Sequence, residues 1–198
     1  MTEIEIKASL AGIGRDTAEA RASALGFRPD CDCREADVYY NAVSRDFRKT
    51  DEALRLREHT ERGVTHVCLT YKGAKQNAVS QTRQELETAV ENGDTMRKIL
   101  LALGYTAVLR VKKDRRTLVG NGSYAGVNLC LDTVEGLGDY MELEFPAPDD
   151  ASDEKKESVL NGLLSLLDSL GVPRENLGQK SYLELLMTRS TSKKSSQG

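Results

Sequence analysis

The sequence lacks any apolar run approaching the roughly 18 residues that a membrane-spanning helix needs. Its first seven residues, MTEIEIK, alternate in character and are charged from the third position, unlike a secretory signal peptide. A net positive charge is also missing, because the 198 residues carry a formal net charge of -3. We therefore expect no membrane segment and no general affinity for nucleic acid.

Cysteine is sparse and scattered. The four residues, at positions 31, 33, 68 and 130, do not form a disulfide framework, which predicts a reduced, cytoplasmic protein. The Cys31-x-Cys33 pair has half the ligands of a zinc site, but no second Cys or His pair has finger-like spacing, so zinc is not predicted. The isolated residues His59 and His66 are typical of surface positions. A GxxxxGK[ST] loop is absent, which excludes a P-loop enzyme.

Several segments have the two-residue period of β-strands, and they are separated by glycine-containing turns. They cover residues 2–9, 35–41, 52–59, 64–72, 81–88, 107–119, 126–133 and 139–146. Helical spacing of apolar residues, with glycine after the first three segments, predicts helices at 16–25, 94–103, 153–170 and 181–187. We expect an α+β protein with a mainly antiparallel sheet, forming one domain over residues 1–187 and followed by a disordered Ser/Lys-rich tail at 188–198.

The charged residues of these strands share one face. Side chains alternate across a strand, so residues of equal parity lie together, as Glu3, Glu5 and Lys7 do on the first strand. The sheet could simply have one wet face. However, single strands carry like-charged pairs, such as Arg55 with Arg57, whereas a solvated face mixes signs. About eight strands also suit closure. The pattern favours an eight-stranded antiparallel closed barrel with a charged lumen and helices outside.

Such a lumen has a chemical meaning, because buried charges must be paired or bound to something. Lysine and arginine side chains neutralise phosphate oxygens, and carboxylates in pairs bind hard divalent cations through oxygen. The two sets together indicate a chain of phosphates with its metal, Mg²⁺ or Mn²⁺.

An ordered set of short motifs then carries a family resemblance. It begins with E-x-E-x-K at residues 3–7 and continues with D-x-Y-Y at 37–40, A-L-R-x-R at 53–57, L-T-x-K-G at 69–73, R-x-E-x-E at 83–87, V-x-K-x-R at 111–115, L-D-x-V-x-G-L-G-x-Y-x-E-x-E at 131–144 and S-Y-x-E-L-L at 181–186. Over residues 1 to about 187 the sequence resembles the CYTH, or triphosphate tunnel metalloenzyme, superfamily. The Gly-Leu-Gly turn and the final motif make it most similar to the class IV adenylyl cyclase branch.

The resemblance implies a role for each matching residue. The metal ligands implied are Glu3, Glu5, Asp132, Glu142 and Glu144, holding Mg²⁺ or Mn²⁺ in a two-metal site. The triphosphate-binding residues implied are Lys7, Arg55, Arg57, Lys72, Arg83, Lys113 and Arg115. We assign catalysis most directly to Glu5, Lys72 and Lys113, and supporting roles to Asp37, Glu85 and Glu87. A homodimer is also consistent with the resemblance.

Two reactions fit the same predicted tunnel. A cyclase converts ATP to cyclic AMP and pyrophosphate, and this is our first expectation. A triphosphatase hydrolyses tripolyphosphate, thiamine triphosphate or a nucleoside triphosphate. A non-catalytic binder of nucleotides or polyphosphate and a purely structural protein with salt-bridged strands are the remaining alternatives.

Overall fold

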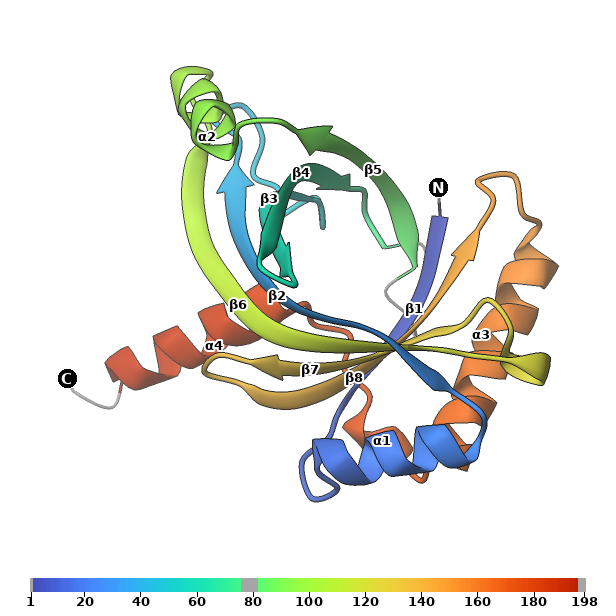
Figure 1. Ribbon diagram of the computed structural model, residues 1–198. Helices are drawn as coiled ribbons and strands as arrows, with labels where there is room; N and C mark the ends of the chain where they lie inside the picture. The colour runs from blue at the N-terminus through green and yellow to red at the C-terminus, as the bar shows by residue number, and fades with distance from the viewer. Residues whose placement is uncertain (1, 76–81, 196–198) are drawn as a thin grey trace.

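Eight antiparallel strands close into a barrel, as the alternation predicts. The structure is a computed structural model that describes residues 2–75 and 82–195. The strands are β1 (Thr2–Ser9), β2 (Arg28–Asn41), β3 (Ala53–Glu61), β4 (Val64–Lys72), β5 (Arg83–Val90), β6 (Thr106–Val119), β7 (Asn128–Val134) and β8 (Gly138–Ala147). Their order around the barrel is β1-β5-β4-β3-β2-β6-β7-β8 (Figure 1). The β1–β5 seam is the shortest, with Thr2 opposite Gln84 and Glu3 opposite Arg83.

Four helices lie outside the strands: α1 (Arg15–Ala24), α2 (Gly93–Ala102), α3 (Asp153–Ser169) and α4 (Tyr182–Ser195). Two 3₁₀ turns, η1 (Gly122–Tyr124) and η2 (Arg174–Asn176), complete the described elements. The side chains of Asn92 and Ser152 accept hydrogen bonds from the first turns of α2 and α3. Gly104 follows α2 with a φ of 89°, a left-handed conformation that glycine adopts without steric cost.

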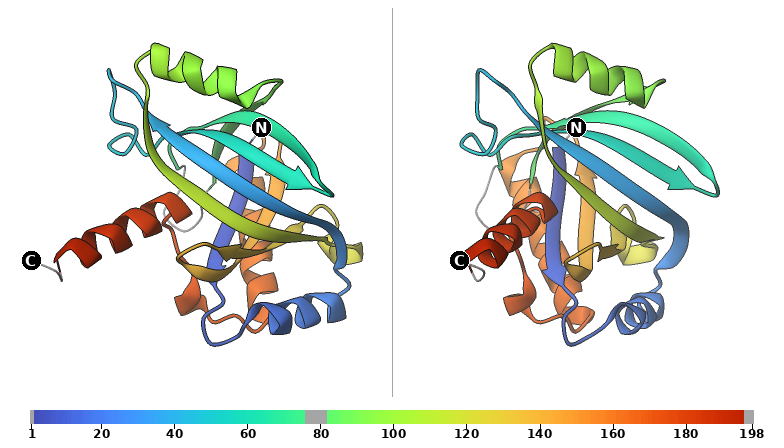
Figure 2. Two further views of the ribbon diagram at one scale, coloured as in Figure 1. Left: turned by 60° about the vertical axis from the view of Figure 1, so that its left-hand side comes forward. Right: turned by 90° about the vertical axis from the view of Figure 1, so that its left-hand side faces the viewer.

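The helices bury the apolar outer face of the barrel. Helices α1 and α3 pack side by side against β1, β7 and β8, where α3 contributes Leu163, Leu166 and Leu167 to the largest core (Figures 1 and 2). On the other side, Leu100 of α2 packs near Leu54 and Leu56 of β3. Because the apolar residues of each strand face the helices, the residues that alternate with them face the lumen.

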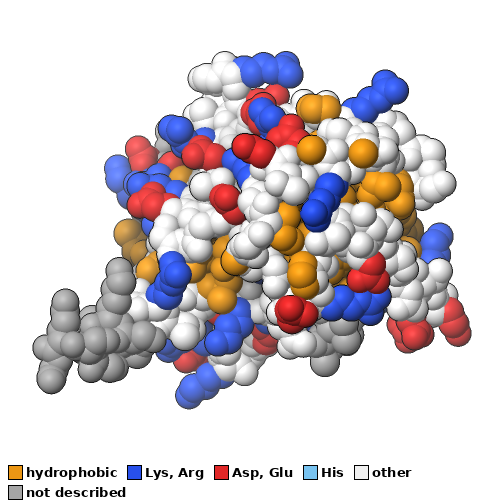
Figure 3. Space-filling view, turned by 90° about the horizontal axis from the view of Figure 1, so that it is seen from below, with side chains coloured by type: hydrophobic (Ala, Val, Ile, Leu, Met, Phe, Trp, Pro, Cys, Tyr) orange, Lys and Arg blue, Asp and Glu red, His pale blue; other side chains and the backbone are white. Residues whose placement is uncertain are grey.

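The solvent-facing surface differs from the lumen in its charge pattern. Figure 3 shows basic and acidic side chains interspersed over one face, with hydrophobic side chains in small groups between them. Typical surface pairs are Arg34 with Asp114 and Arg174 with Asp168. None of the helices in the described ranges is long and apolar enough to cross a membrane.

Two predicted boundaries differ from the structure by more than two residues. Strand β2 begins at Arg28 rather than at residue 35, and a register shift between Pro29 and Cys31 interrupts its pairing with β6. Proline and the bulge interrupt the alternation that identifies a strand in the sequence. Helix α4 continues to Ser195, so residues 188–195, expected in a tail, are helical. Once its first turns are formed, further turns cost little, and polar residues are tolerated in them. The end of the predicted tail, 196–198, lies outside the described residues.

We predict that Leu166→Ala lowers the free energy of unfolding by about 2–5 kcal/mol, because it opens a cavity between α3 and the barrel. The side chain of Leu166 is only 1% exposed. The matched control is Leu101→Ala on α2, where the side chain is 50% exposed, and its effect is expected within about 0.5 kcal/mol. Chemical denaturation of both variants measures the difference, and equal effects would contradict the packing described here.

Candidate active site

A cavity of about 700 Å³ occupies the barrel. It is lined by charged side chains from β1, β2, β3, β4, β5, β6 and β8, together with residues of the 47–53 loop and the start of α4. The predicted site residues that line it are Glu3, Glu5, Lys7, Asp37, Arg55, Arg57, Lys72, Arg83, Glu85, Glu87, Lys113, Arg115, Glu142 and Glu144. Residues that are far apart in the sequence therefore meet in one space.

One group of lumen cations is held tightly by carboxylates. The guanidinium of Arg115 lies 2.7 Å from Asp132 and 3.1 Å from Glu144, and it also contacts Glu142. The guanidinium of Arg57 lies 2.7 Å from Asp37. Such close pairing compensates the loss of hydration that burial imposes on each charge.

Asp132 lies in the barrel wall rather than on the cavity surface. It is 0% exposed, and its two oxygens accept hydrogen bonds from Arg115, Lys113 and the hydroxyl of Tyr182. The N–O distances to Lys113 and Arg115 are 3.0 and 2.7 Å. With its oxygens engaged in this way, Asp132 positions the two cations.

A second group of cations has longer contacts. The amino group of Lys7 lies 3.8 Å from Glu142, its nearest carboxylate, and the guanidinium of Arg83 lies 3.9 Å from Asp51. Arg55 is 3.5 Å from Asp37, and its buried Nε has no hydrogen-bond partner among the described residues. An unsatisfied buried donor is costly, so the site is suited to an anion with several acceptor oxygens.

Lys72 lies between carboxylates of two strands. Its amino group contacts Glu85 of β5 and lies 3.7 Å from Glu3 of β1. Neighbouring Glu87 accepts a 2.6 Å hydrogen bond from the buried hydroxyl of Thr70. Glu85 and Glu87 therefore orient side chains of the β4–β5 wall.

Four carboxylates gather on the adjacent strands β1 and β8. Cross-strand pairing places Glu5 opposite Glu144 and Lys7 opposite Glu142. Burial and the charge of Glu142 raise the pKa of Glu5 to about 8, and burial with the charge of Glu144 raises that of Glu3. The carboxylates of Glu5 and Glu142 are buried and those of Glu3 and Glu144 half-buried, and such a set of mutually repelling oxygens is a suitable donor set for a hard divalent cation.

The charge balance is different on the β6 side. Burial alone would raise the pKa of Glu142, but the charges of Lys113 and Arg115 outweigh it and hold that pKa well below its usual range. The charges of Lys113 and Arg57 likewise outweigh burial and hold the pKa of Glu35 well below its usual range. The lumen thus contains ionised carboxylates beside the tightly held cations.

Glu35 and Tyr182 contact the lumen cations but are missing from the sequence prediction. Glu35 is buried, and its carboxylate lies 2.9 Å from Arg57 and 3.2 Å from Lys113. It has the parity of Asp37, which is the signal that could have identified it. Tyr182 enters the lumen from α4, and the amino group of Lys7 lies 4.4 Å from its ring centroid. No strand pattern marks a residue that arrives from a helix.

We call the end of the cavity beside the 47–53 loop and α4 its mouth, where apolar side chains join the lining. Its lining includes Phe47 of the 47–53 loop, Leu86 of β5, and Leu183 and Met187 of α4. Lys75 donates to Asp51 from its backbone nitrogen at 2.9 Å and from its amino group at 2.7 Å. Organic and anionic parts of one ligand would therefore meet different surroundings along the barrel axis.

A closed antiparallel barrel that surrounds a ring of basic residues and a cluster of carboxylates is a tunnel built for a polyanion and a cation. The CYTH domain model matches residues 1–182 of the sequence, so the chain belongs to the CYTH domain family. Members of this triphosphate tunnel family are mostly enzymes and are generally metal-dependent. The donor set on β1 and β8 fits that general requirement.

Several known proteins are similar over nearly their full length. The protein named "Putative adenylate cyclase MJ0240" of Methanocaldococcus jannaschii is 36% identical over 185 residues, which cover 93% of this chain and 98% of that protein. The structure of the PH1819 protein of Pyrococcus horikoshii has a TM-score of 0.84 and 34% identity, covering 94% and 99% of the two chains. The structure of HpAC1 from Hippeastrum, described as having a dominant triphosphatase activity, shares the fold at 15% identity and a TM-score of 0.61, covering 96% and 95%.

We predict that Tyr182→Phe lowers the free energy of unfolding by about 1–2 kcal/mol, since it removes a hydrogen bond to the buried charge of Asp132. The ring stays in place, so the packing beside Lys7 is retained. Tyr140→Phe is the control, because that ring packs on Tyr182 at 5.2 Å and its hydroxyl has no hydrogen bond to another described residue. Thermal and urea unfolding compare the two, and an equal loss in both variants would contradict the role given to the Tyr182 hydroxyl.

Proposed function

We propose that the protein is a metal-dependent adenylyl cyclase, which converts ATP to cyclic AMP and pyrophosphate in the barrel tunnel. The observation that carries the proposal is the composition of the cavity, with loosely paired cations inside, carboxylates on β1 and β8, and apolar side chains at the mouth. A nucleoside triphosphate has the matching sequence of parts, with a polyanionic end and an aromatic base.

We assign the phosphates to the loosely paired cations Lys7, Arg55 and Arg83, together with Lys72, which contacts Glu85. Lys7, Arg55, Lys72 and Arg83 line the cavity from β1, β3, β4 and β5, so they reach a linear anion from several sides. Arginine presents two parallel donors to a phosphate and lysine a compact charge. The tightly paired Arg57, Lys113 and Arg115 add positive potential and hold the carboxylates in position.

Glu3, Glu5, Glu142 and Glu144 are the residues that would hold Mg²⁺ or Mn²⁺, because their oxygens line one side of the cavity. The bound ions supply charge neutralisation and lower the pKa of the attacking hydroxyl. Glu5 is buried and interacts with both Glu142 and Lys7, so it lies where the carboxylates meet the phosphate-binding cations.

In the proposed reaction the ribose 3′-oxygen forms a bond to the α-phosphorus, and the bond from that phosphorus to the β-phosphate oxygen breaks. The hydroxyl proton passes to solvent, and pyrophosphate leaves with the electron pair of the broken bond. The lumen cations stabilise the negative charge that develops on pyrophosphate, so catalysis rests on positioning and electrostatics.

The mouth supports a nucleotide over inorganic tripolyphosphate. Phe47, Leu183 and Met187 offer apolar and aromatic contact surface that an inorganic anion does not use. The name "Putative adenylate cyclase MJ0240" of the M. jannaschii relative supports this assignment. Water attack at the terminal phosphorus in the same tunnel is the competing reaction, and the activity described for HpAC1 makes product analysis the decisive experiment.

The test is to incubate the protein with ATP, tripolyphosphate or thiamine triphosphate in Mg²⁺ or Mn²⁺ and to separate the products by chromatography. We expect cyclic AMP and pyrophosphate in equal amounts from ATP. Orthophosphate without cyclic AMP would replace the cyclase with a triphosphatase. Metal-dependent binding without turnover would identify a non-catalytic binder.

Glu5→Gln and Lys72→Met are expected to reduce turnover by at least about a hundredfold, because the first removes a carboxylate ligand of the proposed ions and the second removes a positive charge beside the phosphates. Lys112→Met is the control, since Lys112 faces outward and pairs with the exposed Glu135 at 3.4 Å. Melting curves must show folded protein in each case. Near wild-type turnover in folded Glu5→Gln or Lys72→Met would contradict the site assignment.

Affinity for tripolyphosphate tests phosphate binding independently of turnover. Arg83→Gln is expected to weaken binding of tripolyphosphate at least about tenfold, as loss of a charged hydrogen bond costs roughly 1.5–3 kcal/mol. Arg110→Gln is the matched control, because Arg110 is exposed on the outer face and bonds to Glu58 at 2.8 Å. Isothermal titration calorimetry measures both, and unchanged affinity in Arg83→Gln would remove this residue from the phosphate site.

A further inference from the structure

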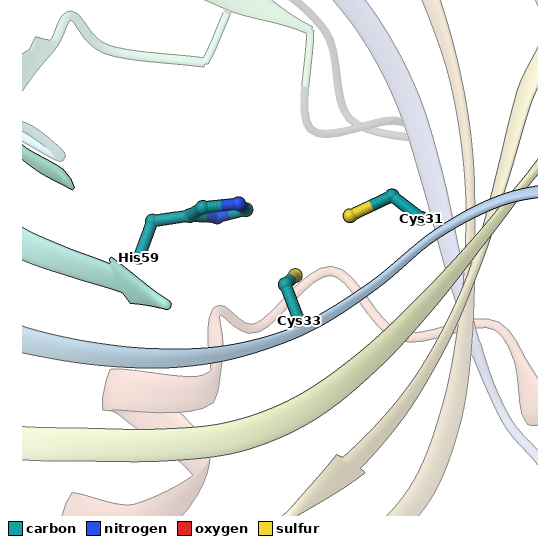
Figure 4. Close-up of side chains that lie close together, drawn as sticks. All are labelled: Cys31, Cys33 and His59. Carbon is teal, nitrogen blue, oxygen red and sulfur yellow. The ribbon is translucent and has the colours of Figure 1, made fainter. Parts of the chain in front are cut away.

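A cluster of sulfur and nitrogen atoms lies at the other end of the lumen from the 47–53 loop. Going away from that loop, the inward residues of β2 are Asp37, Glu35, Cys33 and Cys31, and those of β3 are Arg57, His59 and Glu61. Cys31, Cys33 and His59 each offer one ligand atom, and these atoms all lie within 4.8 Å of one another. Their side chains point toward one another across the β2–β3 pair (Figure 4).

The distances are close to those of a metal site. Two zinc–sulfur bonds of about 2.3 Å at a tetrahedral angle place the sulfur atoms roughly 3.8 Å apart. Side-chain rotations that move the ligand atoms by about 1 Å therefore allow all three atoms to bind one ion. The register shift next to Cys31 contributes to this arrangement, because a bulge changes the direction of the side chains beside it.

The surroundings of His59 match those of a metal-bound imidazole. Its Nδ1 lies 3.3 Å from Oε1 of Glu35. Histidine ligands commonly donate one ring N–H to a carboxylate while the other nitrogen binds the ion. A hydrogen bond from Nδ1 to Glu35 leaves Nε2 of His59 available as a ligand.

We propose that Cys31, Cys33 and His59 form a second metal site, which binds one transition-metal ion of the Zn²⁺ class at the end of the lumen away from the 47–53 loop. Two thiolates and an imidazole are the ligands that Zn²⁺ prefers, whereas Mg²⁺ and Mn²⁺ prefer oxygen. The carboxyl group of Glu61 lies beside the Cys31 thiol and adds negative charge. On binding, the ion replaces the two thiol protons, which pass to solvent.

This site is separate from the carboxylates proposed for Mg²⁺ or Mn²⁺. Glu35, Arg57 and Lys113 form a layer of ion pairs between the cluster and the cavity that holds Glu3 and Glu5. Cys31 and His59 are half-exposed, so an ion can enter from solvent without passing through the tunnel. The inference therefore stands whether or not the protein is a cyclase.

Co²⁺ is the probe that distinguishes the two sites, since thiolate ligands give it an intense near-ultraviolet charge-transfer absorption that carboxylates do not. The metal-stripped full-length protein, kept reduced with a phosphine, is titrated with Co²⁺ and then with Zn²⁺. We expect one equivalent of thiolate-bound Co²⁺, displaced by one equivalent of Zn²⁺. Absence of this absorption in the reduced wild-type protein would overturn the proposal.

Variants locate the ion. Cys33→Ser and Cys31→Ser each remove one thiolate and are expected to lose at least about half of the absorption, and these variants and His59→Gln to weaken Zn²⁺ affinity at least about tenfold, the size of effect that even a supporting residue gives. Cys68→Ser is the thiol control and Glu5→Gln the tunnel control, and both should retain the absorption. Loss in Cys68→Ser, or full retention of the absorption in folded Cys33→Ser, would place the ion elsewhere and overturn the assignment. Melting temperatures without metal show that each variant is folded.

Discussion

Burial of charge inside a closed barrel is the constraint on which the other features of this protein depend. Strand alternation sends every second residue into the lumen, and many of these residues are lysine, arginine, aspartate or glutamate. Each buried charge must find an opposite charge, a polar partner or a ligand. The arrangement of ion pairs around the lumen is the response to this requirement, and what the pairs leave unsatisfied becomes the binding site.

The lumen cations divide according to their pairing. Arg57 and Arg115 form close contacts with two or more carboxylates, so they belong to the framework of the barrel. Among the described residues, Lys7, Arg55 and Arg83 form only ion pairs of 3.5 Å or longer, which suits them to contact an anion. A barrel of this kind gains its shape and its affinity from the same residue types, and the difference between the two roles lies in distances of about one ångström.

The helices determine where the ends of the tunnel are. α1 and α3 shield the apolar outer face, which allows the strands to present their charged face inward. α4 brings Tyr182 into the lumen, where its ring lies on Lys7 and its hydroxyl donates to Asp132. Its neighbours Leu183 and Met187 give the mouth its apolar character. The opposite end carries the thiols and imidazole of Cys31, Cys33 and His59.

The sequence by itself determined the barrel, the inward face of each predicted strand and most of the residues in the cavity, because a two-residue period is a local property that closure does not change. Only the tertiary structure decided which charges pair, that Asp132 lies in the wall, that Tyr182 enters from a helix, and that His59 meets Cys31 and Cys33. These outcomes depend on cross-strand register, on the bulge in β2 and on the docking of α4, which join residues remote in the chain and leave no periodic signal in the sequence.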